Sequence, residues 1–326
     1  ELGFYYTQQG QAELLERSVL TNNGKRMTGD SLFYDRNRGI GEAFQNVEFV
    51  DTISKNMLTG DYCFYNQLTG YAFATDKAVA TDFSQGDSLF IHADTLQLYT
   101  FHVNTDSVYR EARAYHKVRF YRTDIQGVCD SLVFSSKDSC LTLYQDPILW
   151  NGKQQLLGEE IMVYMNDSTI DWAHIQNQAL SVEQLDSLNY NQVSGKDMKA
   201  YFEGGEMKQV DVDGSVRLVY FPMEKDSTLL GMNCSETSKL SMFLENRKLK
   251  KMAMSPKSNG TLYPMTQIPP AKMKLDNFAW FDYVRPLNKA DIFNWRGKGA
   301  GQELKKSTRG AAPLPNQKLF ENTKKE

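Results

Sequence analysis

The sequence predicts an all-β fold of stacked antiparallel strands with an irregular C-terminal extension. Three observations support this fold class. A short phrase recurs along the chain, its apolar residues alternate with a period of two, and a glycine heads most copies. Strict alternation is typical of a strand with one buried face, and a phrase that recurs at intervals of a few tens of residues is typical of repeat architectures.

The recurring phrase is most complete at Gly29, where the chain reads "GDSLFY". It returns as "GDYCFY" from Gly60, "GDSLFI" from Gly86 and "DSLVF" from Asp130, and more weakly as "GEEIMV" from Gly158 and "GKDMKA" from Gly195. Its first apolar column contains Leu32, Cys63, Leu89, Leu132, Ile161 and Met198. Two residues later, a second column contains Tyr34, Tyr65, Ile91, Phe134, Val163 and Ala200. Both columns therefore lie on one face of a strand.

A second strand is expected in each unit, because "GQAELLERSVLT" from Gly10 aligns with "GYAFATDKAVAT" from Gly70. The heading glycines recur every 26 to 41 residues, as Gly29, Gly60, Gly86, Gly127, Gly158, Gly195 and Gly231. We expect each glycine to form the turn before a strand, since its backbone is permissive. The spacing predicts a stack of β-hairpin rungs that share a continuous interior.

The letters Gly-Asp-Ser-Leu are also the nucleophile signature of a class of serine esterases. In that class the serine leaves a strand and enters a helix, whereas Ser31 and Ser88 are each followed by a strand-like run. The same column contains Tyr62 and Glu160 in sister copies, which cannot replace a serine nucleophile. The sequence therefore predicts a protein that is not an enzyme.

The bulk composition narrows the function further. A net charge of −3 over 326 residues argues against a basic nucleic-acid-binding protein, although residues 296–326 have a local charge of +5. There is no apolar run long enough for a transmembrane helix. The four cysteines have no CxxC spacing, so no zinc site or other metal site is expected, and no cofactor. Cys129 and Cys140 are expected to be buried free thiols.

The chain is expected to divide into three parts. Residues 1–263 form the repeat array, which is interrupted near 179–200 by a short helix in Ala179–Asn191 with Ser181 as its N-cap. Hairpin turns are predicted at Asp213-Gly214 and around Glu245–Arg247. Residues 264–296, rich in proline and aromatic residues, are expected to cap the last rung, and residues 297–326 to form a basic, disordered tail.

The "GD-x-L-x-Y" strand, followed by an alanine-bearing strand that closes in Val-x-Phe or Val-x-Thr, resembles the OstA-like family. The resemblance covers roughly residues 10–255, with "YNQVSGKDMKAYFEGGEMKQVDVDGSVRLVYFP" from Tyr190 similar to the longer members. It implies an open V of antiparallel strands, a β-taco or β-jellyroll, whose apolar slot shields the acyl chains of lipopolysaccharide. It also implies a periplasmic protein, with outer-membrane association left open.

On this interpretation the partners are lipopolysaccharide or a related lipid, and other transport-bridge proteins or a second copy that pairs through edge strands. The groove would be lined by eleven residues of the two apolar columns: Leu32, Tyr34, Cys63, Tyr65, Leu89, Ile91, Leu132, Phe134, Ile161, Val163 and Met198. The alternative is a β-solenoid scaffold in which the same side chains fill a closed core.

Overall fold

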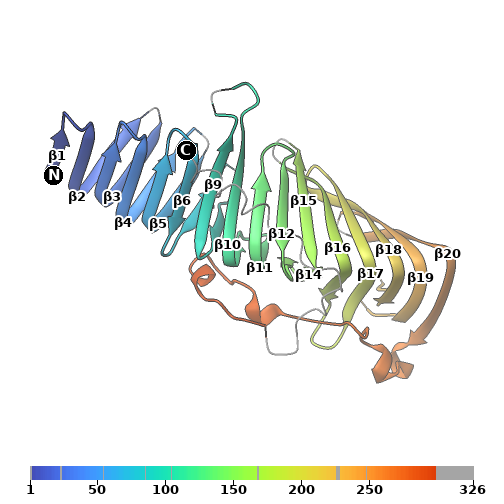
Figure 1. The fold of residues 1–326 in the computed structure, drawn as a ribbon. Helices are drawn as coiled ribbons and strands as arrows, with labels where there is room; N and C mark the ends of the chain where they lie inside the picture. Colours follow the sequence, from blue (N-terminus) through green and yellow to red (C-terminus); the bar gives the residue numbers. More distant parts are fainter. Residues whose placement is uncertain are drawn as a thin grey trace.

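The fold is a single antiparallel sheet of 20 strands, seen in a computed structural model that describes residues 2–22, 24–53, 55–84, 86–103, 105–166, 169–224, 228–246 and 248–298 (Figure 1). The prediction of an all-β stack is confirmed, since helical structure in these ranges is limited to four 3₁₀ turns. The strands are β1 Leu2–Tyr6, β2 Gln11–Asn22, β3 Lys25–Asp35, β4 Ile40–Asp51, β5 Asn56–Asn66, β6 Tyr71–Thr75, β7 Val79–Asp82, β8 Leu89–His92, β9 Thr95–Phe101, β10 Tyr109–Tyr121, β11 Gln126–Ser135, β12 Cys140–Tyr144, β13 Ile148–Asn151, β14 Gln154–Leu157, β15 Glu160–Asn166, β16 Thr169–Gln184, β17 Tyr190–Glu203, β18 Glu206–Tyr220, β19 Gly231–Glu245 and β20 Lys248–Pro264.

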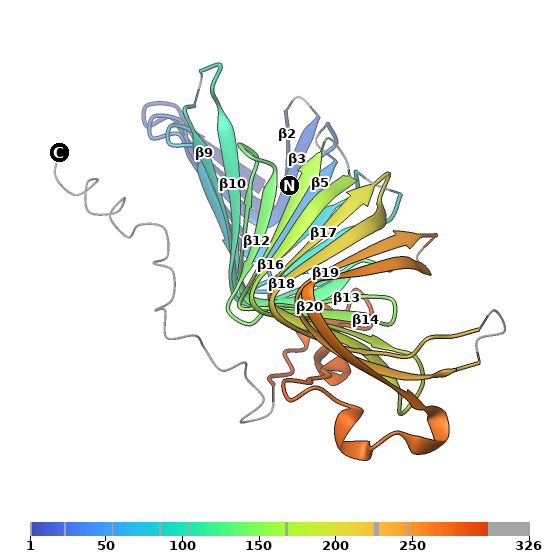
Figure 2. The same cartoon turned by 90° about the vertical axis from the view of Figure 1, so that its right-hand side faces the viewer.

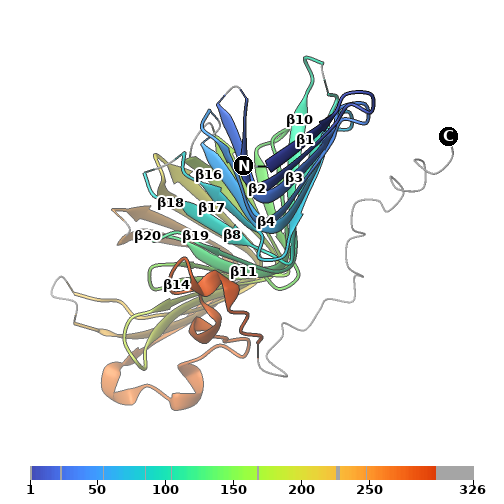
Figure 3. The ribbon, with the colours of Figure 1, turned by 90° about the vertical axis from the view of Figure 1, so that its left-hand side faces the viewer.

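Seen along the stack, the strands spread from a common crease into two walls (Figure 2). Each passage of the chain across the crease is called a crossing. Long strands such as β2 and β17 make a whole crossing and contribute to both walls, whereas other crossings consist of two short strands, one in each wall, such as β12 and β13. We call the wall that contains β6, β9, β12 and β15 the upper wall, and the wall that contains β7, β8, β13 and β14 the lower wall. The opposite view shows the same V from its N-terminal end (Figure 3).

The crease is built by β-bulges that recur in alternate crossings. At each one, two consecutive residues have positive φ, and the register with a neighbouring strand shifts by one residue. These pairs are Glu16–Arg17, Gln45–Asn46, Asp76–Lys77, His116–Lys117, Gln145–Asp146 and Asn177–Gln178. Bulges bend a strand and increase its local twist. Their alignment in one line therefore folds the sheet into a V.

Several of the heading glycines lie at this crease, whereas Gly86 precedes β8 and Gly231 begins β19. Gly29, Gly60 and Gly195 lie in the middle of β3, β5 and β17, so the expectation that each forms a turn before a strand is wrong for these copies. The reason is close packing at the bend. A Cβ on Gly60 would lie 3.0 Å from the carbonyl oxygen of Thr75, and one on Gly195 would lie 2.5 Å from a methyl group of Val212.

The aspartate of the phrase has a structural role beside the bulges. Asp30 pairs with Arg17 at 3.3 Å, and Asp61 pairs with Lys77 at 2.9 Å, each partner being a bulge residue. His116 lies 3.5 Å from Asp130, again with the bulge residue as partner. Ser31 continues within β3 and does not enter a helix. In the copies at Gly29 and Gly60 the Gly-Asp pair is thus explained by the geometry of the crease.

Two local predictions, a helix and a hairpin turn, are wrong because the residues concerned are paired with neighbouring strands. Residues Ala179–Asn191 contain no helix: β16 runs to Gln184, and β17 begins at Tyr190. Asp213-Gly214 is not a hairpin turn but a bulge inside β18, where the register shifts against both β17 and β19. Pairing with a neighbour on each side overrides local propensity. The predicted hairpin after Glu245 is confirmed by the pairing of β19 with β20.

Residues 265–298, which we call the strap, run back from β20 along the outer face of the lower wall (Figure 1). Its 3₁₀ turns are η1 Met265–Gln267, η2 Pro270–Lys272, η3 Asp282–Val284 and η4 Asp291–Phe293. Phe281 and Val284 are buried there against Val128, Ile148, Trp150, Leu157, Leu180 and Val182. The strap reaches His92 and Arg119, and so extends well beyond the last rung. Apart from Gly297 and Lys298, the predicted tail lies outside the described residues.

Candidate functional site

The inner face of the upper wall contains two continuous rows of side chains, one residue per strand in register. The crease row consists of Leu14, Leu32, Ala43, Cys63, Ala74, Leu96, Ala114, Leu132, Leu143, Ile161, Ile175, Met198, Val212, Leu240 and Met254. The rim row, two residues farther from the crease, consists of Ala12, Tyr34, Gly41, Tyr65, Ala72, Leu98, Ala112, Phe134, Leu141, Val163, Ala173, Ala200, Val210, Met242 and Met252.

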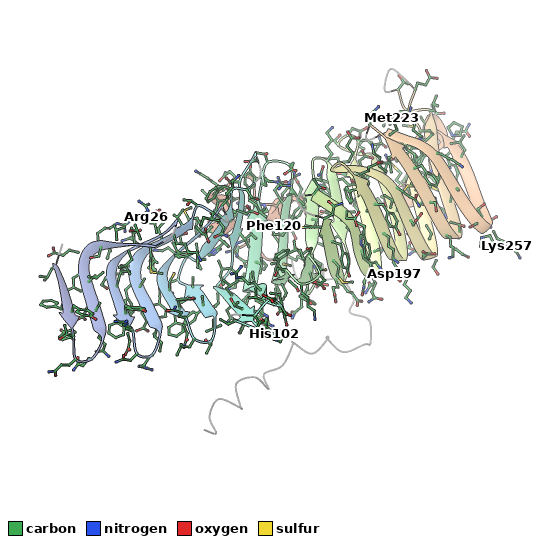
Figure 4. All side chains as sticks on the ribbon, turned by 90° about the horizontal axis from the view of Figure 1, so that it is seen from above. Arg26, His102, Phe120, Asp197, Met223 and Lys257 are labelled. Atoms are coloured by element: carbon green, nitrogen blue, oxygen red, sulfur yellow. The ribbon has the colours of Figure 1, made fainter. Side chains whose placement is uncertain are left out.

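A facing row lies on the inner side of the lower wall. It consists of Leu20, Met27, Phe49, Leu58, Ala80, Ile91, Phe120, Gly127, Leu149, Leu156, Ser181, Val193, Leu218, Ser235 and Gly260. Members of all three rows belong to one apolar cluster. None of the residues in these rows carries a charge. We call the space between the walls the trough, and the side chains follow the stack along its length (Figure 4).

The structure places the predicted groove residues on these inner faces. The crease row contains Leu32, Cys63, Leu132, Ile161 and Met198, and the rim row contains Tyr34, Tyr65, Phe134 and Val163. Leu89 and Ile91 lie instead on the lower wall, in β8. In this copy the phrase precedes the crease, so the residues equivalent to the other copies are Leu96 and Leu98 of β9.

Exposure increases from the crease to the rim. Near the crease, Leu32 and Met198 are each 2% exposed and Ile161 is fully buried. In the rim row, Tyr34 is 36% exposed, Leu98 37% and Tyr65 43%. The bottom of the trough is therefore a packed core, whereas large apolar side chains at its rim face solvent over the N-terminal half of the stack. Exposed contiguous apolar surface is typical of a binding site.

Burial also keeps the crease uncharged. It raises the pKa of the Cys63 thiol to about 12 and also raises the pKa of the Cys129 thiol. Cys129 and Cys140 are both buried and free, as expected. Within the described ranges, no three His, Cys, Asp or Glu side chains gather as a metal-binding group.

At its β20 end the trough contains a hollow of about 510 Å³. Its lining comes from both walls: Tyr220, Pro222, Asn233, Ser235, Gly260 and Leu262 from the lower wall, and Leu249 and Met252 from the upper wall. Leu262 is 65% exposed, so the hollow opens to solvent at the end of the stack.

Methionines gather on the upper wall beside this hollow. Met242 pairs with Met252 across β19 and β20, and both pack on the inner apolar cluster together with Met207 and Met254. The flexible, polarizable side chain of methionine adapts to ligands of irregular shape. The repeated phrase does not extend to these strands, so sequence reasoning missed this part of the trough. The alternation in "KLSMFLENRKLKKMAM" was the available signal.

The sequence matches no protein-family profile and no curated protein. Among solved structures, the chain is similar to LptH from Pseudomonas aeruginosa, the LptA-homologous periplasmic component of its lipopolysaccharide transport device. The similarity has 14% identity and a TM-score of 0.31, and covers 37% of this chain and 81% of LptH. No helical segment in the described part of the chain has the length and apolarity required to cross a bilayer.

Proposed function

We propose that this protein binds the acyl chains of lipopolysaccharide, or of a related lipid, in the trough and conducts the lipid across the periplasm towards the outer membrane. It acts by shielding apolar surface and catalyses no reaction. The observation that supports this proposal most directly is the set of three uncharged inner rows, which continue from strand to strand along the stack. In the rim row, Tyr34, Tyr65 and Leu98 are partly exposed. The resemblance of the repeats to OstA-like proteins supports the same function.

The physical basis is the transfer of hydrocarbon out of water. Each methylene group moved into apolar surroundings contributes about 0.8 kcal/mol, so an acyl chain of some ten methylenes has a strong preference for the trough. A trough that is open along its rim lets the chains enter sideways while a polar headgroup stays in solvent. No bond has to be made or broken for this transfer.

The ends of the stack provide the surfaces for partners. In the described chain β1 pairs only with β2, and β20 only with β19, so each has an edge with unpaired backbone groups. Such edges readily pair with another strand. We propose that they join a second copy or another bridge protein and so continue the trough. Analytical ultracentrifugation over a concentration series tests self-association. A protein that stays monomeric at all concentrations would exclude pairing with a second copy and leave pairing with another bridge protein.

The test of lipid binding is native mass spectrometry of the purified protein with and without lipopolysaccharide. The double variant Tyr65→Asp, Leu98→Asp places charges on the inner rim at positions that are 43% and 37% exposed, so it should remain folded. We expect a lipid-sized adduct with the original protein and its loss in the variant. The matched control is Phe44→Asp, since Phe44 is 40% exposed but lies on the outer face. If the original protein shows no lipid adduct, with or without added lipopolysaccharide, the result would instead favour the scaffold with a closed core.

A further inference from the structure

We propose that the hollow at the β20 end seats the carbonyl group of an acyl ester or acyl amide, so that the trough selects acyl lipids over plain hydrocarbon. This inference rests on the proposed function and adds a polar recognition element to it. The observation is a pair of polar side chains, Asn233 and Ser235, inside a lining that is otherwise formed by apolar residues, Tyr220 and Gly260.

The polar pair is oriented by an internal hydrogen bond. The hydroxyl of Ser235 donates to Oδ1 of Asn233 at 2.7 Å, and Ser235 is 7% exposed. This bond directs the amide of Asn233 and uses its oxygen as an acceptor. The Asn233 Nδ2 group donates to no acceptor among the described residues, so its N–H groups are free to donate to a ligand in the hollow. A carbonyl oxygen is the complementary acceptor.

The neighbouring strand leaves the pair uncovered. Gly260 lies directly opposite Ser235 in β20, and Leu262 lies opposite Asn233. A Cβ on Gly260 would lie 2.7 Å from the Ser235 hydroxyl oxygen and 3.7 Å from Oδ1 of Asn233. A side chain at position 260 would therefore collide with the Ser235 hydroxyl and contact the Asn233 amide. The glycine keeps open the space that a ligand group would occupy.

The rest of the hollow suits the hydrocarbon part of the same ligand. Leu249 and Met252 face the polar pair from the upper wall, and Tyr220 and Leu262 flank it on the lower wall. A carbonyl that enters apolar surroundings without a donor loses its hydrogen bonds to water, which is unfavourable. Asn233 replaces that lost donor, whereas an alkane gains nothing from it. The hollow thus discriminates between chains that have a carbonyl group and chains that lack one.

The test is competition for a fluorescent hydrophobic probe, N-phenyl-1-naphthylamine, bound to the full chain. The two competitors are an N-methyl fatty amide and an n-alkane with the same number of carbons. We expect the amide to displace the probe about five-fold better after correction for its partition into octane, the factor that one net hydrogen bond provides. In Asn233→Leu this preference should disappear, while displacement by the alkane is retained.

Two further variants separate recognition from folding. Gly260→Ala should also remove the preference, because its methyl group closes the space at the polar pair. Asn259→Leu, on the adjacent exposed residue of the same strand, should leave it intact. If the amide and the alkane displace the probe equally well from the original protein, the proposed carbonyl seat is wrong, while binding of hydrocarbon in the trough is still supported. Failure of both competitors, together with failure to bind the probe, overturns lipid binding and the seat with it.

Discussion

Gln155 and Phe281 are joined by a hydrogen bond in which the backbone N–H of Phe281 donates to Oε1 of Gln155 at 2.8 Å. The amide group of Gln155 also donates to the carbonyl of Ala279 at 2.9 Å. Gln192 repeats this pattern with Leu275 N–H and the Met273 carbonyl. A glutamine amide thus takes the place of a neighbouring strand and holds the strap by its main chain.

This arrangement predicts the effect of Gln155→Leu. The change leaves two backbone groups of the strap without partners under a buried surface, and each such group costs about 1–3 kcal/mol. We expect a drop in the free energy of unfolding of about 2–5 kcal/mol, measured by urea denaturation, with earlier proteolytic cleavage in the strap. Gln97→Leu, on the outer face of the upper wall away from the strap, is the control and should change stability by less than about 1 kcal/mol.

The crease and the rim should differ in their contribution to stability. Ile161 is fully buried in the crease row, so Ile161→Ala should lower the free energy of unfolding by about 2–5 kcal/mol. Leu98→Ala, at a rim position that is 37% exposed, should cost less than about 1.5 kcal/mol because less surface is lost from the core. Equal losses at both positions, measured by calorimetry, would show that the rim is as closed as the crease and would contradict an open trough.

The glycine of the repeated phrase should be essential only where it lies in the crease. A Cβ at Gly195 would approach Val212 to 2.5 Å, so Gly195→Ala should destabilise the protein by about 1–3 kcal/mol through overpacking. Gly86 heads another copy of the phrase, but a Cβ there meets nothing within 4 Å. Gly86→Ala should be neutral or slightly stabilising in the same denaturation experiment. The reverse order would refute the close-packing explanation.

Stability should decrease in mild acid because of His92. Burial lowers the pKa of this imidazole, against the hydrogen bond that it donates to the Ala78 carbonyl at 2.7 Å. The folded state therefore binds a proton less readily than the unfolded chain, so stability falls as the pH drops through the unfolded pKa of about 6.5. The ring packs on Phe293 of the strap with 4.7 Å between centroids, so the strap should loosen first.

The measurement for this prediction is the melting temperature from pH 7.5 to pH 5. His92→Gln retains a donor for the Ala78 carbonyl but cannot titrate, so its melting temperature should fall less over this range. His102→Gln is a suitable control, because His102 is exposed and distant from the strap. An unchanged slope in His92→Gln would assign the acid sensitivity to other groups.

By itself, the sequence determined the fold class and the inner face of the sheet. Alternation with a period of two is a local property, since successive side chains point to opposite faces of a strand. The columns that begin with Leu32 and Tyr34 could therefore be recognised without knowledge of their neighbours. The Gly-Asp pair recurs while the serine after it is replaced by other residue types in sister copies, which likewise indicated a structural role for the phrase.

Only the tertiary structure decided how those strands are bent and covered. The turn-like Asp213-Gly214 became a bulge, and residues 180–183 of the predicted helix became strand, because each segment is paired with a neighbour on both sides. Asn233 and Gly260 lie on adjacent strands but are 27 residues apart in sequence. Gln155, in a strand, and Phe281, in the strap, are in contact at a separation of 126 residues. Such relationships depend on the register between distant segments, which hydrophobic periodicity along one strand does not encode.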